Sequence, residues 1–502
     1  MPANNHLVVV PVSSRSHIRL FLQLTLNLLA LHPSLVATML VSSVSYPIVL
    51  KEIDLQPQRI MDSLEGRFRV KRATDGLEST ASRPDEQQAF ERCISSDLGD
   101  LFAEKAEGRF VTKPCLVIND LFRAFVRDAV RQKTDELGIS TVPVIQFLPT
   151  MALIMHRYLQ GGWAEHMVER YLENKAAGME ENAAARKAFR GIQNQLQEWP
   201  DLPPMYDYEF SEFSRPKQTP ARLLLASVKA NIVPELDAAS LKAMSRVRGS
   251  PVIGVGPQFN ADVWNAAEEE EKSAKAQEDE KRIMSFLDAA LGKYGTNSSA
   301  YISFGTVFWP EERPELVTAI IESLLELTEP IPFILATATA NGKADPALKK
   351  RIEASGRGLI VDWAPQVRVL RHDAVGMFLT HCGFNSLTEA IMTGVPIITM
   401  PFAADQPALS AHFTQIRKMG IQLYQLSSGN DGQTLGNGVH VNSTPEAMQE
   451  ELRTTWIQMR GPQGEEFRKN TIRVRGLMRK SYEEGGTREA MLSLSQYFTD
   501  KE

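Results

Sequence analysis

Cysteine is scarce in this chain. Only three cysteines occur in 502 residues, and none stands in a CxxC pair or beside histidine at the spacing of metal ligands. This excludes a disulfide scaffold and a structural zinc site, and it favours a reducing compartment. We therefore expect a cytoplasmic protein.

Long hydrophobic runs are also missing. The richest apolar segment, 20–31, is interrupted by polar residues and falls short of the roughly 20 residues that span a bilayer. The first basic residue is Arg15, so no positively charged region precedes an apolar stretch as in a signal peptide. The sequence predicts no transmembrane segment.

A basic surface field is absent as well. The net charge is −6, so nothing draws the phosphates of a nucleic acid towards the protein. The sequence also lacks a strand-flanked DxD motif for Mg²⁺, a GxxxxGK[ST] phosphate loop and a GxGxxG dinucleotide turn. We expect no nucleic-acid partner, no metal and no cofactor.

What the sequence does contain is an alternation of strand and helix patterns. The apolar run 6–12 is followed by a polar turn and a helix-length segment, 18–31, and 35–43 returns as a second strand. Further pairs of a strand and a helix follow at 115–138 and from residue 141. This alternation is typical of a parallel sheet with helices on both faces.

A charged segment divides the chain. Residues 256–282 include the run AAEEEEKSAKAQEDEKR, which cannot bury itself and is predicted to be a solvated linker or insertion. The alternation restarts after it, with strands at 300–306, 332–337, 358–363, 376–381 and 395–401 and helices at 311–328 and 386–392. We predict an α/β protein with two doubly wound, Rossmann-like domains facing across a cleft, where such sheets bind ligands.

Polar side chains with binding chemistry gather in the second half of the chain. A strand delivers His381 to a glycine-containing turn at a helix start, where backbone N–H groups and the helix dipole favour a phosphate. Asn385 and Ser386 add side-chain donors there. Glu389 lies one helical turn beyond Ser386 and can accept hydrogen bonds from ribose hydroxyls. This turn is a candidate nucleotide site.

Residues before and after this turn in the sequence also have side chains suited to binding a ligand. Trp363 offers a flat face for a base, and Asp405 and Gln406 provide acceptors and donors for a polyhydroxylated ring. Over its full length, 363–406 resembles the donor-binding signature of the family 1 UDP-glycosyltransferases, which have the GT-B fold. One departure is Phe384, where plant members commonly have tryptophan.

The resemblance implies a role for each matching residue of a UDP-sugar site. The assignments are Trp363 and Gln366 for the uracil, His381, Asn385 and Ser386 for the diphosphate, Glu389 for the ribose, Asp405 and Gln406 for the sugar, and Ser303 and Thr306 in a second phosphate turn, SFGT. No metal is implied, so the helix dipole, backbone donors and His381 would meet the charge of the leaving group.

The resemblance also implies a catalytic base. The family has a histidine at the end of the first loop, where this chain has His17, and an aspartate that orients it, where this chain has Asp120. The family's GHxxP pattern lacks its glycine and proline here. An alternative interpretation of Asp120 is a carboxylate that caps the following helix.

Residues for the acceptor are less well marked. Thr150 resembles a residue that contacts the donor sugar in some members, and Met155 belongs to an apolar stretch that is a candidate lining of an acceptor pocket. We take both as candidate acceptor contacts. The alternatives are an ordinary turn threonine and a core methionine.

Together these features predict an inverting, metal-independent hexosyltransferase. It would move a sugar, by analogy glucose, from UDP to a hydroxyl of a small lipophilic alcohol or phenol. The expected organisation is an acceptor-binding domain at 1–255, the linker or insertion at 256–282, a donor-binding domain at 283–480 and a C-terminal helix at 481–502 that returns to the first domain.

Three alternatives remain open on the sequence alone. A UDP-GlcNAc epimerase or a macrolide transferase would share the fold, although the 44-residue signature 363–406 fits them less well. A non-catalytic sugar-nucleotide-binding subunit would keep this signature and lose the base. A Rossmann oxidoreductase would bind NAD instead of UDP.

Overall fold

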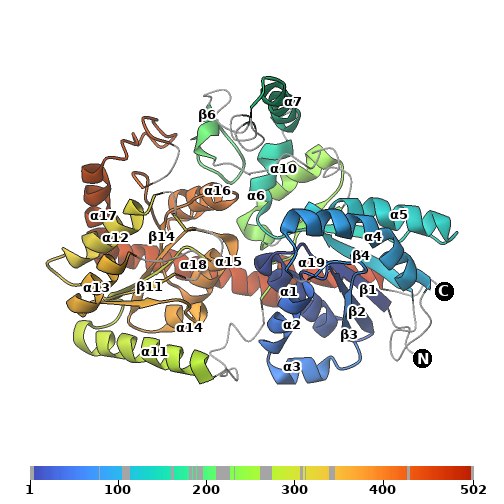
Figure 1. The fold of residues 1–502 in the computed structure, drawn as a ribbon, viewed down its shortest axis with the longest axis horizontal. Helices are drawn as coiled ribbons and strands as arrows, with labels where there is room; N and C mark the ends of the chain where they lie inside the picture. Colours follow the sequence, from blue (N-terminus) through green and yellow to red (C-terminus); the bar gives the residue numbers. More distant parts are fainter. Residues whose placement is uncertain are drawn as a thin grey trace. The chain divides into compact units, whose positions relative to one another are not determined.

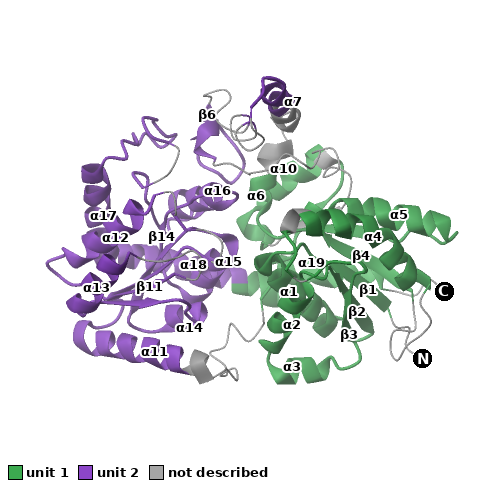
Figure 2. Cartoon of the chain, viewed as in Figure 1, with its two compact units in different colours: residues 1–164, 217–270, 479–502 green, residues 165–216, 271–478 purple. Residues whose placement is uncertain are grey.

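The computed structural model divides the chain into two compact units (Figures 1 and 2). Unit 1 comprises residues 1–164, 217–270 and 479–502, and unit 2 comprises 165–216 and 271–478. The structure describes residues 5–78, 80–103, 113–159, 163–179, 184, 188, 196–210, 227–230, 232–259, 274–305, 309–310, 313–337, 345–426 and 430–498.

Unit 1 is built on a parallel seven-stranded sheet in the order β3-β2-β1-β4-β5-β8-β9. Its strands are β1 (Asn5–Val10), β2 (Leu35–Val41), β3 (Phe68–Arg72), β4 (Pro114–Asp120), β5 (Val144–Leu148), β8 (Ser227–Ala230) and β9 (Val252–Gly254). Its helices include α1 (Arg15–Leu31), α2 (Tyr46–Asp54), α3 (Gln58–Ser63), α4 (Arg83–Ala103), α5 (Phe125–Glu136), α6 (Ala152–Leu159), α10 (Ala238–Arg248) and α19 (Gly486–Leu492).

Helices cover both faces of this sheet because its strands are apolar on both sides. One face packs against α1 and α19, with Leu7, Val9 and Ile118 in a shared core. The other face packs against α4 and α5, with Val8 and Val117 in a second core. Alternate residues of one strand therefore enter opposite cores, as in a doubly wound fold.

Unit 2 repeats this plan with a parallel six-stranded sheet in the order β12-β11-β10-β13-β14-β15. The strands are β10 (Ser299–Ser303), β11 (Phe333–Ala336), β12 (Gly358–Val361), β13 (Val375–Thr380), β14 (Ile397–Thr399) and β15 (Gly420–Gln422), and a hairpin of β6 (Leu196–Gln197) and β7 (Met205–Tyr206) lies apart from them. The helices include α7 (Trp163–Ala176), α11 (Ala274–Tyr294), α12 (Glu315–Leu325), α13 (Pro346–Ser355), α14 (Gln366–Arg371), α15 (Phe384–Thr393), α16 (Gln406–Ala411), α17 (Pro445–Arg460) and α18 (Pro462–Glu483).

The two parallel sheets confirm the predicted α/β class with two doubly wound halves. The helix predicted at 311–328 is shorter and begins at Glu315, with Pro314 as its N-cap. Pro314 fits there because the residue before the first helical turn needs no intrahelical N–H bond.

Some segments are grouped differently from the sequence interpretation. The 165–216 segment, expected in the first domain, clusters with unit 2. Part of the predicted linker is helical, because α11 begins at Ala274 and anchors itself through the buried side chains of Ile283 and Leu287. In the part of the chain that the structure describes, no helix is both long and apolar enough to cross a membrane.

Candidate active site

His17 and Asp120 meet at the carboxyl end of the sheet of unit 1. β1 and β4 are neighbours in that sheet, with Val10 opposite Asn119. Asp120 is the last residue of β4, and His17 lies in the first turn of α1, the helix that follows β1. The carboxyl ends of parallel strands are where ligands of such sheets bind.

A short hydrogen bond joins the two side chains. His17 Nδ1 lies 2.7 Å from Asp120 Oδ2, and the imidazole is 20% exposed while the carboxylate is fully buried. The other oxygen, Oδ1, accepts a hydrogen bond from the backbone N–H of Phe122 at 3.0 Å. Asp120 therefore orients His17 and caps the following 3₁₀ turn at once, so the two interpretations of this residue are compatible.

This geometry defines the tautomer of the neutral imidazole. A carboxylate only accepts, so Nδ1 carries the proton and Nε2 carries the lone pair. Nε2 of His17 is thus the atom that can take a proton from a substrate. The buried carboxylate would stabilise the imidazolium that results.

The two candidate acceptor residues of unit 1 are buried. Thr150 and Met155 are both more than nine-tenths covered. Helix α6, which carries Met155, is capped by Asp237, whose Oδ2 accepts hydrogen bonds from the backbone N–H groups of Ala152 and, at 3.2 Å, Leu153. Contact of Thr150 or Met155 with an acceptor stays a prediction.

In unit 2 the turn after β13 has the conformation expected of an anion-binding site. Cys382 adopts a positive φ of 62°, and Gly383 is the N-cap of α15 without a side-chain hydrogen bond to the cap. The first N–H groups of a helix have no intrahelical acceptor and lie at the positive end of its dipole. Asn385 and Ser386 belong to this first turn.

The ring of His381 is wedged between two glycines. A Cβ at Gly305 would lie 2.7 Å from Cε1 of His381, and a Cβ at Gly383 would lie 2.4 Å from Nε2. Burial lowers the pKa of His381 to about 4, so the imidazole is neutral at pH 7. His381 can therefore supply an N–H donor to a diphosphate, whereas the helix end supplies the positive charge.

Gln366 contacts two other residues of the predicted donor site. Its Nε2 donates to Ser386 Oγ at 3.2 Å and to Glu389 Oε2 at 2.6 Å. α14 thus contacts α15 through residues that stand 20 and 23 positions apart in the sequence. Trp363, just before α14, keeps 47% of its surface exposed, so its face is accessible for stacking.

Asp405 and Gln406 lie at the start of α16. Gln406 is almost fully buried, and its Oε1 accepts hydrogen bonds from the backbone N–H groups of Phe402 at 2.8 Å and Ala403 at 3.1 Å. The amide oxygen thus shapes the turn, and the Nε2 donors are the part of Gln406 suited to a sugar hydroxyl. Asp405 is the N-cap residue of the helix.

The second phosphate turn is described only in part. Ser303 ends β10 and is buried, and its Oγ accepts the Gly305 N–H at 3.4 Å. Gly305 itself has a positive φ of 78°. Thr306 lies outside the described residues.

The sequence interpretation missed several residues that shape these sites. Gly305 and Gly383 set the space around His381, but only Gly383 stands near this histidine in the sequence, so no local signal marks Gly305. Arg123 and Glu86 form a buried pair beside the His17 loop. No local signal marks that pair, because 37 residues separate its members. Among the described residues, no group of three or more His, Cys, Asp or Glu side chains is arranged to hold a metal ion.

Comparison with known families agrees with this architecture. Residues 270–429 match the family model described as UDP-glucoronosyl and UDP-glucosyl transferase. The chain is 32% identical over 281 residues to the UDP-glycosyltransferase eriJ of Hericium erinaceus, covering 52% of this chain and 53% of the relative. It is 26% identical over 256 residues to UDP-glycosyltransferase 75B2 of Arabidopsis thaliana, covering 47% and 55%. The chain thus spans about half the length of these relatives.

Solved structures extend the fold match to nearly the whole chain. The Medicago truncatula UGT71G1 complexed with UDP-glucose is 18% identical with a TM-score of 0.67, covering 99% of both chains. A UGT transferase from Siraitia grosvenorii in complex with UDP is 19% identical with a TM-score of 0.66, covering 98% of this chain and 100% of that chain. At this identity the likeness concerns the fold. Residues 270–429 thus resemble the UDP-glucoronosyl and UDP-glucosyl transferase family, and the chain has the GT-B fold of these solved UDP-glycosyltransferase structures.

Proposed function

We propose that this protein transfers a sugar from a UDP-sugar to a hydroxyl group of a small lipophilic acceptor. The observation that carries the proposal is the 2.7 Å hydrogen bond between His17 Nδ1 and the buried Asp120 carboxylate. It gives unit 1 an oriented base at the carboxyl end of a parallel sheet. The matched family model, which covers the predicted donor residues of unit 2, supports a nucleotide-sugar co-substrate.

The reaction we propose is a direct displacement with inversion. Nε2 of His17 removes the proton of the acceptor hydroxyl while that oxygen attacks the anomeric carbon of the sugar. The bond from this carbon to the diphosphate breaks, and UDP leaves from the opposite face. An α-linked donor gives a β-glycoside, and the imidazolium is stabilised by Asp120 until the proton reaches solvent.

The donor would be held by unit 2. Trp363 and Gln366 take the uracil, and Glu389 takes the ribose. His381 and the first turn of α15, with Asn385 and Ser386, take the diphosphate together with Ser303 and Thr306. The positive end of the α15 dipole and the neutral His381 suit an anion, so we propose that leaving-group charge is met without a metal.

Glucose is the sugar that we propose. Support comes from Asp405 and Gln406, the pair that the family resemblance assigns to the sugar hydroxyls, and from the glucosyl description of the family model. Because Oε1 of Gln406 already accepts two backbone N–H groups, its Nε2 would donate to the sugar. Acceptor binding by unit 1, with Thr150 and Met155, and a cytoplasmic location stay predictions.

A non-catalytic sugar-nucleotide-binding subunit is the competing hypothesis. It predicts UDP binding without turnover. The oriented base argues against it, because a subunit that only binds the nucleotide has no need of a buried carboxylate aimed at an imidazole.

The test is UDP release from UDP-glucose with phenolic and sterol acceptors in the presence of EDTA. Replacement His17→Ala should lower acceptor-dependent turnover by about 10²–10⁴-fold, the usual contribution of a general base, and leave UDP affinity unchanged. Replacement Glu389→Ala should weaken UDP binding instead. The control is His440→Ala, at an exposed histidine of unit 2, which should change neither quantity. Turnover by the His17→Ala variant at the wild-type rate would exclude His17 as the base.

A further inference from the structure

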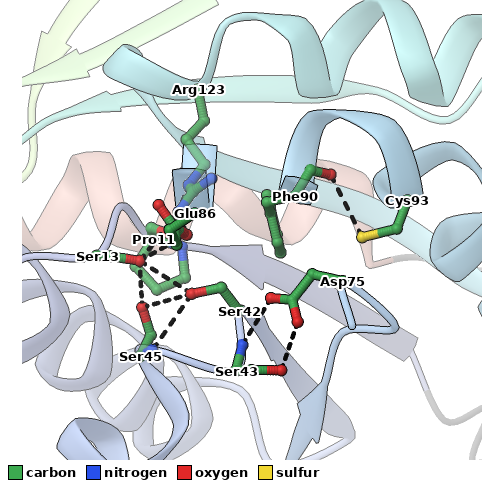
Figure 3. A network of polar contacts seen from close by, with 10 residues as sticks. All are labelled: Pro11, Ser13, Ser42, Ser43, Ser45, Asp75, Glu86, Phe90, Cys93 and Arg123. Atoms are coloured by element: carbon green, nitrogen blue, oxygen red, sulfur yellow. Dashed lines mark hydrogen bonds and ion pairs between the residues drawn. The ribbon is translucent and has the colours of Figure 1, made fainter. Parts of the chain in front are cut away.

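A buried ion pair lies behind the loop that precedes His17 (Figure 3). Arg123 Nη2 and Glu86 Oε1 are 2.5 Å apart, and the side chains are only 1% and 2% exposed. Arg123 ends the 3₁₀ turn that follows Asp120, and Glu86 lies in the first turn of α4. A buried pair of this kind contributes little net stability, because desolvation of both charges offsets their attraction. The role of this pair is therefore to be sought in its contacts with the loop and not in its contribution to stability.

Both members of the pair hold the loop 11–14. Arg123 Nε donates to the Pro11 carbonyl at 3.0 Å, and Nη2 donates to Ser13 Oγ at 3.2 Å. Ser13 Oγ in turn donates to Glu86 Oε1 at 2.7 Å. A guanidinium presents its donors in a rigid plane, so these contacts fix both the position and the direction of the loop.

The surroundings restrain the guanidinium further. The ring of Phe90 lies 4.1 Å from the Arg123 Cζ, in cation–π geometry. Ser13 Oγ also lies 3.0 Å from Ser42 Oγ and 2.5 Å from Ser45 Oγ, so the hydroxyl is shared with the turn after β2. Figure 3 shows Ser42 and Ser45 joined to Ser13 by dashed lines.

The pair connects the two residues of the proposed proton transfer. His17 follows Ser14, the end of the loop, by three residues, and Arg123 follows Asp120 by three residues. Asn119 Nδ2 donates to the carbonyls of both Asp120, at 2.8 Å, and Arg123, at 2.9 Å, which closes the turn between them. Two sets of contacts thus fix the segment bearing His17 to the turn after Asp120. One is the hydrogen bond between His17 and the Asp120 carboxylate, and the other is formed by the Arg123 guanidinium with the loop 11–14.

We propose that Arg123, held by Glu86, is a positioning residue that sets the distance and angle between His17 and Asp120. This inference rests on the proposed function, since positioning matters only if His17 acts as the base. Arg123 is buried and does not reach a substrate. Its effect passes through the Pro11 carbonyl and the Ser13 hydroxyl to the start of α1.

The first variant is Arg123→Lys, which keeps the buried charge next to Glu86 and removes the planar fork. The second is the double variant Arg123→Met with Glu86→Leu, which removes both charges together and avoids an unpaired buried ion. The matched control is Arg127→Met, four residues further along the chain, where the arginine pairs with the partly exposed Asp128.

The measurements are kcat with an accepted hydroxyl compound, the dissociation constant of UDP, and the strongly deshielded proton NMR signal of the hydrogen bond between His17 and Asp120. That signal is assigned by its loss in Asp120→Asn. We expect kcat to fall about 10–100-fold in both Arg123 variants, the scale of a misplaced catalytic group. UDP affinity should stay unchanged, and the NMR signal should broaden or vanish.

The outcomes separate this inference from the proposed function. If the wild type turns over and both variants keep its kcat and its NMR signal, Arg123 is not a positioning residue. If the variants lose UDP affinity and the Arg127→Met control does as well, the effect is general destabilisation and the inference fails. If the wild type binds UDP without turnover, the proposed function fails, while the NMR signal still reports whether Arg123 fixes the hydrogen bond.

Discussion

Asp120 divides its two carboxylate oxygens between two partners. Oδ2 accepts from His17 and Oδ1 accepts from the backbone N–H of Phe122. The second contact fixes the rotation of the carboxylate, so Oδ2 is aimed at the imidazole before any substrate arrives. Such preorganisation lets a buried carboxylate stabilise the imidazolium without moving.

Replacement of Asp120 by asparagine tests this role. The amide keeps the shape but removes the negative charge, and its NH2 can stabilise the wrong tautomer of His17. We expect kcat/KM to fall by about 10²–10⁴-fold, within the range for general acid–base catalysis, with UDP affinity unchanged. Asp128→Asn, at a half-exposed carboxylate of α5, is the control and should behave as wild type. Equal effects of the two changes would contradict an orienting role.

His412 is a second histidine with a fixed tautomer. Its Nδ1 contacts the Asp201 carbonyl, and its Nε2 accepts from Arg417 Nε at 3.0 Å. Burial, reinforced by the charge of Arg417, lowers the pKa of His412 to about 4. Protonation of His412 Nε2 would turn this acceptor into a donor that faces the N–H of Arg417. Because two donors repel each other, this contact disfavours the protonated imidazole and gives the lowered pKa a geometric cause.

The lowered pKa of His412 predicts acid sensitivity in unit 2. Between the ordinary pKa of 6.5 and the folded value of about 4, the unfolded chain binds a proton that the folded chain does not. The free energy of unfolding therefore falls as the pH drops through this window, by about 3 kcal/mol at its lower end.

The variant His412→Asn, which keeps a donor for the Asp201 carbonyl, should lose this part of the pH dependence. The measurement is hydrogen-exchange protection of α16 and β14 amides at pH 7 and pH 4.5, compared with the wild type and with His440→Asn. The other titrating groups of unit 2 contribute equally to the pH dependence of all three proteins, so their contributions cancel in the comparison. An unchanged pH dependence in His412→Asn would show that His412 does not carry it.

At the scale of elements, the site in unit 2 depends on two turns that meet around His381. Gly305 follows β10 and Gly383 follows β13, and these strands are neighbours in the sheet. A side chain at either position would occupy the place of the imidazole. The close approach of two turns, and not the sequence of either one, therefore demands glycine at both positions.

Replacement Gly383→Ala isolates this effect, because Gly383 has an ordinary φ of −65° that alanine adopts without strain. The added methyl would collide with His381 Nε2 and displace the ring from the start of α15. We expect the overpacking to cost about 1–3 kcal/mol of folding stability and the displaced ring to weaken UDP binding.

The matched control for that change is Gly292→Ala in α11. A Cβ there meets no atom within 4 Å among the described residues. Alanine in an open helical position stabilises by about 0.5–1 kcal/mol, and UDP affinity should be unchanged. Calorimetric titration with UDP measures both variants, and equal affinities would contradict the predicted placement of the diphosphate.

At the scale of the whole molecule, the two ends of the chain share one core. Met491, Leu494 and Phe498 pack with Leu7 of β1 and residues of α1 in the core of unit 1. The boundary between the units falls within α18, so this one helix carries the chain back to unit 1. The segment 491–498 therefore contributes to the same core as β1, and we expect the stability of unit 1 to depend on it.

Truncation of Leu494 tests this dependence. Leu494 is 1% exposed, so Leu494→Ala should cost about 2–5 kcal/mol, as other buried leucines do. Leu492, two residues earlier, is 39% exposed, and Leu492→Ala should cost only about 0.5 kcal/mol. Hydrogen exchange should accelerate in β1 and β2 of the first variant alone, with β10 and β13 unchanged. Equal exchange in the two variants would show that the C-terminal segment does not support unit 1.

Much of this protein follows from its sequence because the relevant information is local. Buried parallel strands are apolar runs, and the turn and helix that carry His381, Asn385, Ser386 and Glu389 are contiguous along the chain. The α/β class could therefore be predicted, whereas the binding of a donor at this turn stays a prediction. The predicted start of the helix at 311 was wrong, because α12 begins at Glu315 and local capping decides such boundaries.

The tertiary structure decided which distant residues share a partner. The hydrogen bond between His17 and Asp120 was expected only from the family resemblance, and the pair of Arg123 and Glu86 was not expected at all. No periodicity marks such pairs, since their members lie on different elements and meet only when the sheet forms. Local patterns fix strands, helices and turns through backbone preferences, whereas long-range packing alone determines which buried charges face one another.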